Sequence, residues 1–403
     1  MAGANGSKVD VVVVGGGIVG LSAAWRARRR GMSVTVLERD RTGRGASYVA
    51  AGMLAPVAEA EFGEGGRRLL ELGLRSAEMW PGFAAELEEA TGESVGLSQT
   101  GTLILARDED EARELERQLA FRQSLGLRAE RLRASVARER EPGLAPTVRL
   151  ALEAPDDHSV DPRLALGALR KACEAGGVPI REHAAVESLV LDGAGGRVTG
   201  VVLRGGERVS AGQVVLAAGA WTGQIAGLPD DALVPVRPVK GQMLRLRDPA
   251  GPGLLGRVVR FEGGYVVPRA DGRYALGATV EEKGFELEPT VGGVYELLRD
   301  ASELVPGIDE LRIEELTVGL RPGTPDNAPA VGPGALEGLT WATGHHRNGI
   351  LLAPLTAELV LATLTGEATE RSDSFLAACA PDRFAAATRE PQAGSLAHPG
   401  AGS

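Results

Sequence analysis

The stretch Asp10–Glu38 reads DVVVVGGGIVGLSAAWRARRRGMSVTVLE, and its pattern predicts the fold around it. The apolar run over Asp10–Val14 is typical of a strand buried on both faces. Ile18–Arg30 follows as a helix closed by Gly31, and Ser33–Leu37 is a second apolar strand. The stretch therefore predicts a βαβ unit with a glycine-rich turn between its first strand and its helix.

That turn carries the spacing G-x-G-x-x-G. Gly15 would permit the tight turn, Gly17 would let a pyrophosphate approach the backbone, and Gly20 would let the helix pack on the strand. The helix start supplies N–H donors and a positive dipole end. Glu38 stands eighteen residues after Gly20, where an acidic side chain can accept hydrogen bonds from an adenosine ribose. This context favours a dinucleotide site over an empty glycine-rich turn.

The segment after Glu38 bears on which dinucleotide binds. Arg39–Met53 reads RDRTGRGASYVAAGM, and small residues dominate its second half. A bulky flat ring needs backbone that can come close to it, and small side chains permit that approach. Composition alone would also allow an ordinary surface loop. A nicotinamide enzyme would instead be expected to continue directly into further βα units, so we expect FAD.

Length and composition limit the other possibilities. The chain has 403 residues, 43% hydrophobic and 24% charged, which suits one large or two interleaved domains with a sizeable core. The net charge of −10 disfavours binding to nucleic acid or to an anionic membrane. Cys173 and Cys379 lie far apart and form no motif, and no segment reaches ~18 apolar residues. We therefore expect a soluble, cytoplasmic protein without a metal site.

The rest of the chain reads as strands and helices around a β-rich block. Residues 48–98 are expected to alternate loop and helix, Val239–Gly277 to form antiparallel sheet, and Gly349–Thr365 to form a helix. The β-rich block separates parts of the nucleotide-binding domain. The predicted boundaries are 9–80, 150–235 and 320–375 for the FAD-binding domain, 81–149 and 236–319 for a substrate-binding domain, and 1–8 and 385–403 for disordered tails.

Several motifs together resemble a known family. They are GGGIVG, Glu38, GASYVAAGM, VVLAAGAW, GYVVPRADGRYALGAT, GLRPGTPDNAPAVG and GHHRNGILLAP. Over about residues 9 to 380 the sequence resembles the FAD-dependent amine oxidases that include D-amino-acid oxidase and sarcosine oxidase. The combination of AAGMLAP, LRPGTPDNAP and GHxRNGILLAP is most specific to the glycine-oxidising branch. The resemblance implies an α/β fold with a Rossmann-like FAD-binding domain and an interleaved antiparallel-sheet substrate domain.

The resemblance also implies which residues surround the cofactor. His345 to Leu351 would line the flavin ring, with a helix beginning near Gly349 aimed at the pyrimidine, and His346 stands where the family often has an aromatic residue. A metal on His345 and His346 is disfavoured because no Cys or carboxylate cluster completes a site. The expected cofactor contacts are Gly15, Gly17, Ile18, Val19, Gly20, Glu38, Arg39, Ala46, Ser47, Ala51, Gly52, Met53, Val186, Ala218, Gly219, His345, His346, Arg347, Asn348, Gly349, Ile350 and Leu351.

Three further residues are candidates for the substrate site. An amino-acid substrate brings a carboxylate, for which a partly buried arginine is the natural partner. By resemblance Arg321 grips that carboxylate, the Tyr265 hydroxyl helps to hold it, and Arg347 also contacts substrate. As alternatives, Arg321 could be an exposed turn arginine and Tyr265 a tyrosine that only packs in the sheet. Arg347 could instead form a salt bridge or contact the flavin.

The implied reaction is oxidative deamination of glycine, and of other small amines or D-amino acids, to an imine or glyoxylate. Hydride leaves Cα for the flavin, oxygen reoxidises it to give hydrogen peroxide, and the imine supplies thiazole synthesis for thiamine. D-amino-acid or sarcosine oxidase or dehydrogenase activity is the alternative, and a flavin carrier without turnover or a nicotinamide dehydrogenase is a more distant one. No cysteine lies in the flavin motifs, so FAD should be non-covalent. Family resemblance suggests a homo-tetramer.

Overall fold

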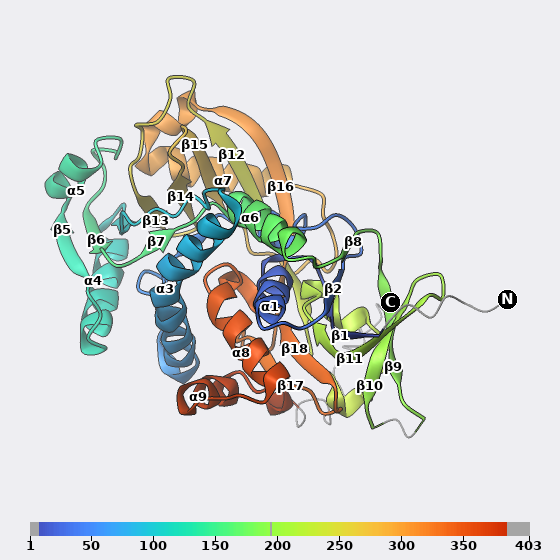
Figure 1. Cartoon of the computed structure of the whole chain (residues 1–403). Coiled ribbons are helices and arrows are strands. Elements are labelled where there is room, and N and C mark those ends of the chain that lie inside the picture. The colour runs from blue at the N-terminus through green and yellow to red at the C-terminus, as the bar shows by residue number, and fades with distance from the viewer. Residues whose placement is uncertain (1–7, 194–195, 385–403) are drawn as a thin grey trace, which may run out of the picture.

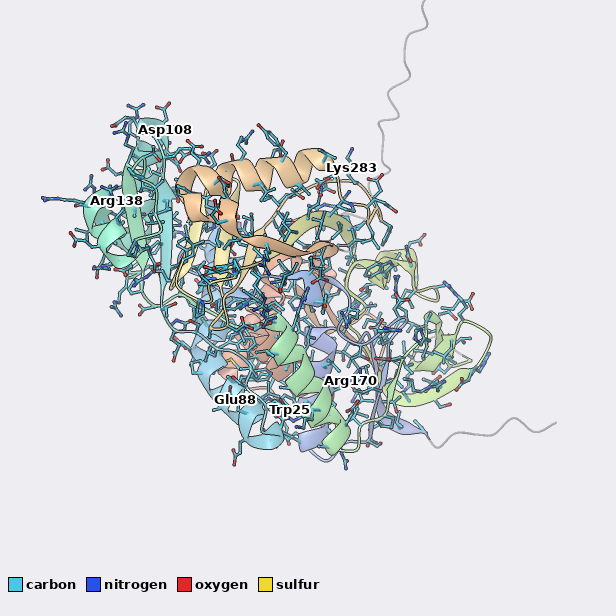
Figure 2. All side chains as sticks on the ribbon, turned by 90° about the horizontal axis from the view of Figure 1, so that it is seen from above. Trp25, Glu88, Asp108, Arg138, Arg170 and Lys283 are labelled. Carbon is cyan, nitrogen blue, oxygen red and sulfur yellow. The ribbon has the colours of Figure 1, made fainter. Side chains whose placement is uncertain are left out.

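Figure 1 shows the computed structural model, which describes residues 8–193 and 196–384. Apart from residue 8, the predicted disordered tails lie outside the described residues. Within the described part, two eight-stranded sheets and one two-stranded sheet form the framework. Figure 2 shows charged side chains such as Asp108, Arg170 and Lys283 on the outside, whereas Trp25 is buried.

The first sheet contains the predicted βαβ unit, which is confirmed. Its path runs β17-β18-β11-β1-β2-β8, and β1 pairs in parallel with both β2 and β11. Val11 to Val14 and every residue of β2 are buried, which explains the uninterrupted apolar runs. The elements are β1 (Val9–Val14), α1 (Ile18–Arg29), β2 (Val34–Leu37), β8 (Ile180–Arg181), β9 (Val186–Leu191), β10 (Val198–Leu203), β11 (Arg208–Leu216), β17 (Ala330–Pro333) and β18 (Leu339–Thr343).

The second sheet confirms the predicted antiparallel block and extends it. Its order is β16-β12-β15-β14-β13-β4-β6-β5, antiparallel except where β13 meets β4. Its strands are β4 (Thr102–Ala106), β5 (Glu130–Arg133), β6 (Leu150–Ala154), β12 (Arg237–Arg247), β13 (Val258–Phe261), β14 (Gly264–Pro268), β15 (Arg273–Gly277) and β16 (Arg312–Gly323). Residues 150–154 and 320–323 thus pair in this sheet, although the predicted boundaries gave them to the FAD-binding domain. The division into domains itself stays a prediction.

Helices α1, α3, α6 and α8 pack against one another beside the first sheet (Figure 1). The expected alternation of loop and helix over residues 48–98 takes the form of one loop, one helix and a second loop, because α3 is a single helix of 29 residues despite Pro81. Tertiary contacts outweigh the proline: Ser76 Oγ and Trp80 Nε1 both donate to the carbonyl of Leu351, at 2.7 and 2.9 Å. The remaining elements are α2 (Ala46–Val49), β3 (Met53–Leu54), α3 (Gly63–Thr91), α4 (Glu109–Ser124), α5 (Ala134–Arg140), β7 (His158–Ser159), α6 (Pro162–Ala175), α7 (Val291–Leu304), α8 (Ala353–Thr365) and α9 (Glu370–Ala378).

The helix predicted over Gly349–Thr365 begins later than expected. Helix α8 starts at Ala353 with Pro354 in its first turn, where the missing N–H of proline removes no helical bond. Before it, Leu352 N–H donates to the Asn348 carbonyl at 2.8 Å, which makes residues 348–352 a turn instead of the first turn of α8. Gly349 therefore belongs to this turn. Among the described helices, none combines the length and apolar character needed to cross a membrane.

Candidate active site

A cavity of about 1010 Å³ is lined by residues from both large sheets. This volume lies at the upper end of the ~300–1,000 Å³ typical of small-molecule and cofactor sites. The structure brings almost every predicted site residue to its wall. The lining predicted residues are Gly15, Gly17, Ile18, Val19, Glu38, Arg39, Ala46, Ser47, Ala51, Gly52, Met53, Val186, Ala218, Gly219, Tyr265, Arg321, His345, His346, Arg347, Gly349 and Ile350.

Three predicted cofactor contacts, Gly20, Asn348 and Leu351, are not among the lining residues. A β-carbon on Gly20 would lie 2.0 Å from the carbonyl oxygen of Gly15, so Gly20 is needed for close packing beneath the turn. Leu351 is buried, and its carbonyl accepts the hydrogen bonds from α3. The carbonyl of Asn348 accepts the turn-forming bond from Leu352. These three residues therefore support the residues of the cavity wall without lining the cavity themselves.

The glycine-rich turn is formed by backbone. Gly15 has φ of +112°, and a β-carbon there would lie 2.3 Å from the Ala217 carbonyl oxygen. Its N–H donates to the Leu37 carbonyl at 2.8 Å, which ties the turn to β2. Ser47 Oγ accepts from Ile18 N–H at 3.1 Å and fixes the start of α1. The turn is thus a preformed cradle that has no room for larger side chains.

Glu38 braces the same turn from the end of β2. Its carboxylate accepts from the N–H of Gly16 at 2.8 Å and from that of Asp40 at 2.9 Å. Next to it, the Arg39 guanidinium stacks 3.8 Å from the ring centre of Trp221, which also lines the cavity. Trp221 belongs to the motif VVLAAGAW but is not among the predicted site residues.

Arg321 and Tyr265 meet in another part of the cavity, on β16 and β14. The Arg321 guanidinium lies over Gly241, where a β-carbon would approach Nη1 to 2.3 Å, and it donates to the Thr279 carbonyl at 3.0 Å. Within the described residues no carboxylate lies within ion-pair distance of Arg321. Burial raises the pKa of Tyr265, and the nearby Arg321 cation partly offsets that rise. The Tyr265 hydroxyl donates to Met243 Sδ at 3.5 Å, and both Arg321 and Tyr265 line the cavity.

Arg347 forms the salt bridges that were its alternative role, and its contact with substrate stays a prediction. Its Nη2 lies 2.6 Å from Glu61 Oε1 and its Nε 3.7 Å from Glu59 Oε2. Glu59 also lies 3.8 Å from Arg260 Nε. Sequence reasoning missed Glu59, Glu61 and Arg260, although all three line the cavity. The string AEAEFGEGG gave no signal, because it looks like an exposed acidic stretch.

His345 and His346 are both held neutral. Burial lowers the pKa of each to about 4, and for His346 the cations of Arg321, Arg347 and Arg237 add to the effect. His345 Nε2 lies 2.9 Å from Thr356 Oγ1, so this ring ties the cavity wall to α8. His346 adopts a left-handed conformation with φ of +47°. In the described part of the chain, neither belongs to a group of three metal-ligating side chains.

The residues present fit FAD. The glycine cradle at the start of α1 lines the cavity and can hold a pyrophosphate. Gly349 and Ile350 also line the cavity, and their backbone amides have no hydrogen-bond acceptor among the described residues. Such amides can donate to a ring carbonyl or to a developing negative charge. Cys173 and Cys379 are buried away from the cavity, which leaves no thiol there to form a covalent flavin bond.

Comparison with known proteins places the chain among flavoenzymes. Residues 10–363 match the family described as FAD dependent oxidoreductase. The chain is 36% identical to a glycine oxidase of Geobacillus kaustophilus, covering 88% of this chain and 92% of that protein. It is also 38% identical to a bifunctional protein ThiO/ThiG of Trichormus variabilis, over 87% of this chain but only 52% of that relative. This chain thus spans about half the length of that relative.

Solved structures agree with the sequence comparisons. The crystal structure of glycine oxidase from Geobacillus kaustophilus superposes with a TM-score of 0.83 and 35% identity, covering 90% of this chain and 96% of that one. Glycine oxidase from Bacillus cereus gives the same TM-score at 29% identity, covering 92% and 98%. The expected α/β architecture with an interleaved antiparallel sheet is thereby confirmed. This chain belongs to the FAD dependent oxidoreductase family.

Proposed function

We propose that this chain is an FAD-dependent amino-acid oxidase that deaminates glycine, and other small amines or D-amino acids, with oxygen as electron acceptor. The products would be the imine or glyoxylate and hydrogen peroxide, and the imine would supply thiazole synthesis for thiamine. Similarity to the glycine oxidases and to the ThiO/ThiG protein supports this assignment.

The observation that carries the proposal is the position of Arg321. A guanidinium without a carboxylate partner in the described residues faces the same cavity as the glycine-rich turn. An arginine in this setting presents a fork of donors that matches a carboxylate in geometry and charge. A protein that only carries flavin has no use for such a group, which favours an enzyme that binds amino acids.

In the proposed mechanism, FAD held by the glycine-rich turn would supply the redox chemistry as a hydride acceptor. Arg321 and the Tyr265 hydroxyl hold the carboxylate and so fix the direction in which the α-carbon faces. Glu59 and Glu61 are both paired with Arg347, so neither is left to hold a substrate ammonium. This pairing favours the neutral amine, from which a hydride can leave without a dedicated side-chain base.

The size of the substrate is set by the wall around this clamp. Val280 and Leu287, on the loop after β15, line the cavity together with Met243 and Tyr265. One methyl group in an apolar pocket changes binding by only about 1–3 kcal/mol. Sarcosine or small D-amino acids therefore stay alternative substrates. A tetrameric assembly and a cytoplasmic location also stay predictions.

The test is anaerobic mixing of the purified holoenzyme with glycine, sarcosine, D-alanine and D-proline in turn, followed by admission of air. Loss of flavin absorbance with glycine, then its return with hydrogen peroxide, would support the proposal. Bleaching only by the bulkier amines would move the enzyme to a sister activity with the same carboxylate clamp. No bleaching by any of the four would contradict the proposal.

A further inference from the structure

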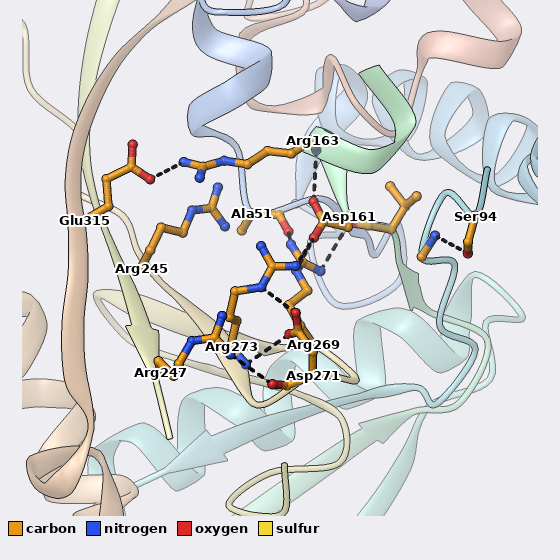
Figure 3. A network of polar contacts seen from close by, with 12 residues as sticks. Ala51, Ser94, Asp161, Arg163, Arg245, Arg247, Arg269, Asp271, Arg273 and Glu315 are labelled. Atoms are coloured by element: carbon orange, nitrogen blue, oxygen red, sulfur yellow. Dashed lines mark hydrogen bonds and ion pairs between the residues drawn. The ribbon is translucent and has the colours of Figure 1, made fainter. Parts of the chain in front are cut away.

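Behind the segment 46–53, which lines the cavity, lies a cluster of arginines that the proposed reaction does not use (Figure 3). Arg245 Nη2 donates to three successive carbonyls, those of Tyr48, Val49 and Ala50, at 3.3, 2.9 and 2.7 Å. Arg269 Nη2 donates to the next carbonyl, that of Ala51. Four consecutive carbonyls thus accept hydrogen bonds from two cations, one on β12 and one directly after β14.

The cluster carries more positive than negative charge. Arg245 is only 9% exposed, has no carboxylate within ion-pair distance in the described chain, and keeps its Nε without an acceptor there. Arg269 shares the carboxylate of Asp161, at 3.6 Å, with Arg273 at 3.5 Å. Burial, reinforced by Arg163 and Arg269, lowers the pKa of Arg245 to about 10, which still leaves it charged at neutral pH. A buried cation with so little compensation is costly to keep.

The amides of the same peptides point away from the arginines. A trans peptide is planar, so its N–H points away from its C=O. The carbonyl of Ala50 shares a peptide with the amide of Ala51, and the carbonyl of Ala51 shares one with the amide of Gly52. Both amides belong to residues that line the cavity, and neither donates to an acceptor among the described residues. Each arginine therefore orients a peptide whose donor is left for a ligand.

Polarisation adds to this orientation. A cation at the carbonyl oxygen draws electron density through the peptide and makes its N–H a stronger donor, most of all where water is excluded. Two-electron, one-proton reduction of FAD leaves one negative charge on the flavin, and charge-assisted hydrogen bonds are about twice as strong as neutral ones. Amides backed by cations thus favour the reduced, anionic flavin over the oxidised, neutral one.

We propose that Arg245 and Arg269 are positioning residues that aim the amides of Ala51 and Gly52 at the cofactor and raise its reduction potential through those two peptides. The proposal rests on FAD binding but not on the identity of the substrate. Arg269 belongs to the motif GYVVPRADGRYALGAT, whereas Arg245 lies outside the motifs quoted above.

The test is the midpoint potential of bound FAD, measured by dithionite titration of the holoenzyme against reference dyes. Arg245→Gln keeps a donor for a carbonyl but removes the charge, so it should weaken binding of reduced relative to oxidised FAD about tenfold, a fall of about 30 mV for a two-electron couple. Arg245→Lys keeps the charge and should retain most of the wild-type potential. Arg269→Gln should change the potential in the same direction as Arg245→Gln.

Arg247→Gln is the matched control. Arg247 lies two residues along the same strand, is partly exposed and pairs with Glu314, so its loss should leave the potential unchanged. A purely structural role would weaken binding of both redox states equally and leave the potential of Arg245→Gln at the wild-type value, which would overturn the proposal. If Arg245→Gln yields no folded protein, Arg269→Gln decides by the same criterion. No step uses glycine, so a failed glycine assay would not affect this result.

Discussion

Around Gly15, Gly17 and Glu38 the cavity wall is mostly backbone, whereas around Arg321, Tyr265 and Arg347 it is side chain. The first wall comes from one contiguous βαβ unit, in which glycines allow close approach and amides act as donors. The second is assembled from β14, β16 and two loops that are distant in sequence. Substitutions in the first wall should therefore affect the fold and the cofactor, and those in the second should affect the substrate.

The largest effect is expected at Gly20. Gly20→Val places side-chain atoms against the Gly15 carbonyl, where even the β-carbon would lie at 2.0 Å, so we expect a loss of about 3 kcal/mol or more of stability and little bound FAD. Thermal unfolding and the flavin-to-protein absorbance ratio measure both. Gly167→Ala, in α6 with open space around it, is the control and should be neutral or slightly stabilising. Wild-type FAD content in Gly20→Val would show that FAD binding does not depend on close packing at the glycine-rich turn.

Arg321→Met should weaken substrate binding at the second wall while leaving cofactor binding at the first wall intact. Loss of the charged partner of the carboxylate, worth roughly 3 kcal/mol, should raise the glycine KM by two or more orders of magnitude. FAD content and melting temperature should stay near wild-type values. Steady-state kinetics with glycine, together with the flavin absorbance ratio, measure these quantities. An unchanged KM would exclude Arg321 from the substrate site.

His345 should make stability depend on pH, because it joins the cavity wall to α8. Its folded pKa of about 4 is below the usual ~6.5, so the unfolded chain takes up the proton first as pH falls. The stability that neutral, buried His345 contributes to the free energy of unfolding is fully present above pH ~6.5. It has fallen by roughly 1–2 kcal/mol at pH 5 and falls further toward pH 4.

Urea unfolding of wild type and of His345→Gln at pH 7.5 and 5 tests this contribution. The variant should lose less stability between the two pH values. Asp157, whose pKa burial raises to about 7, acts in the opposite sense but equally in both proteins, so the difference isolates His345. Identical pH dependence in the two proteins would contradict the prediction.

The smallest effect is expected at Arg347. Its pairs with Glu59 and Glu61 lie at a partly exposed position, and such pairs contribute about 0–1 kcal/mol. Arg347→Met should therefore change the glycine KM less than tenfold, in contrast to Arg321→Met. A KM change as large as that of Arg321→Met would mean that Arg347 exchanges its carboxylates for the substrate.

The sequence predicted the backbone wall well because local spacing determines it. The glycine motif, the apolar strands and Glu38 lie within one short stretch, and the structure forms them as expected. The resemblance supplied Arg321 and Tyr265, which no spacing could have brought together. Glu59, Arg260 and Arg245 were missed because their roles depend on pairing across the fold. The start of α8 was misplaced because an apolar run does not show where a turn gives way to a helix.

The most direct test of the division between the two walls is a titration of the Arg321→Met holoenzyme with acetate, which carries a carboxylate and no oxidisable amine. Acetate binding is followed by the change in flavin absorbance, with wild-type holoenzyme alongside. We expect equal FAD content in both proteins and acetate binding at least a hundredfold weaker in Arg321→Met. Acetate binding of wild-type strength in Arg321→Met, or loss of FAD from it, would show that Arg321 does not serve the substrate site alone.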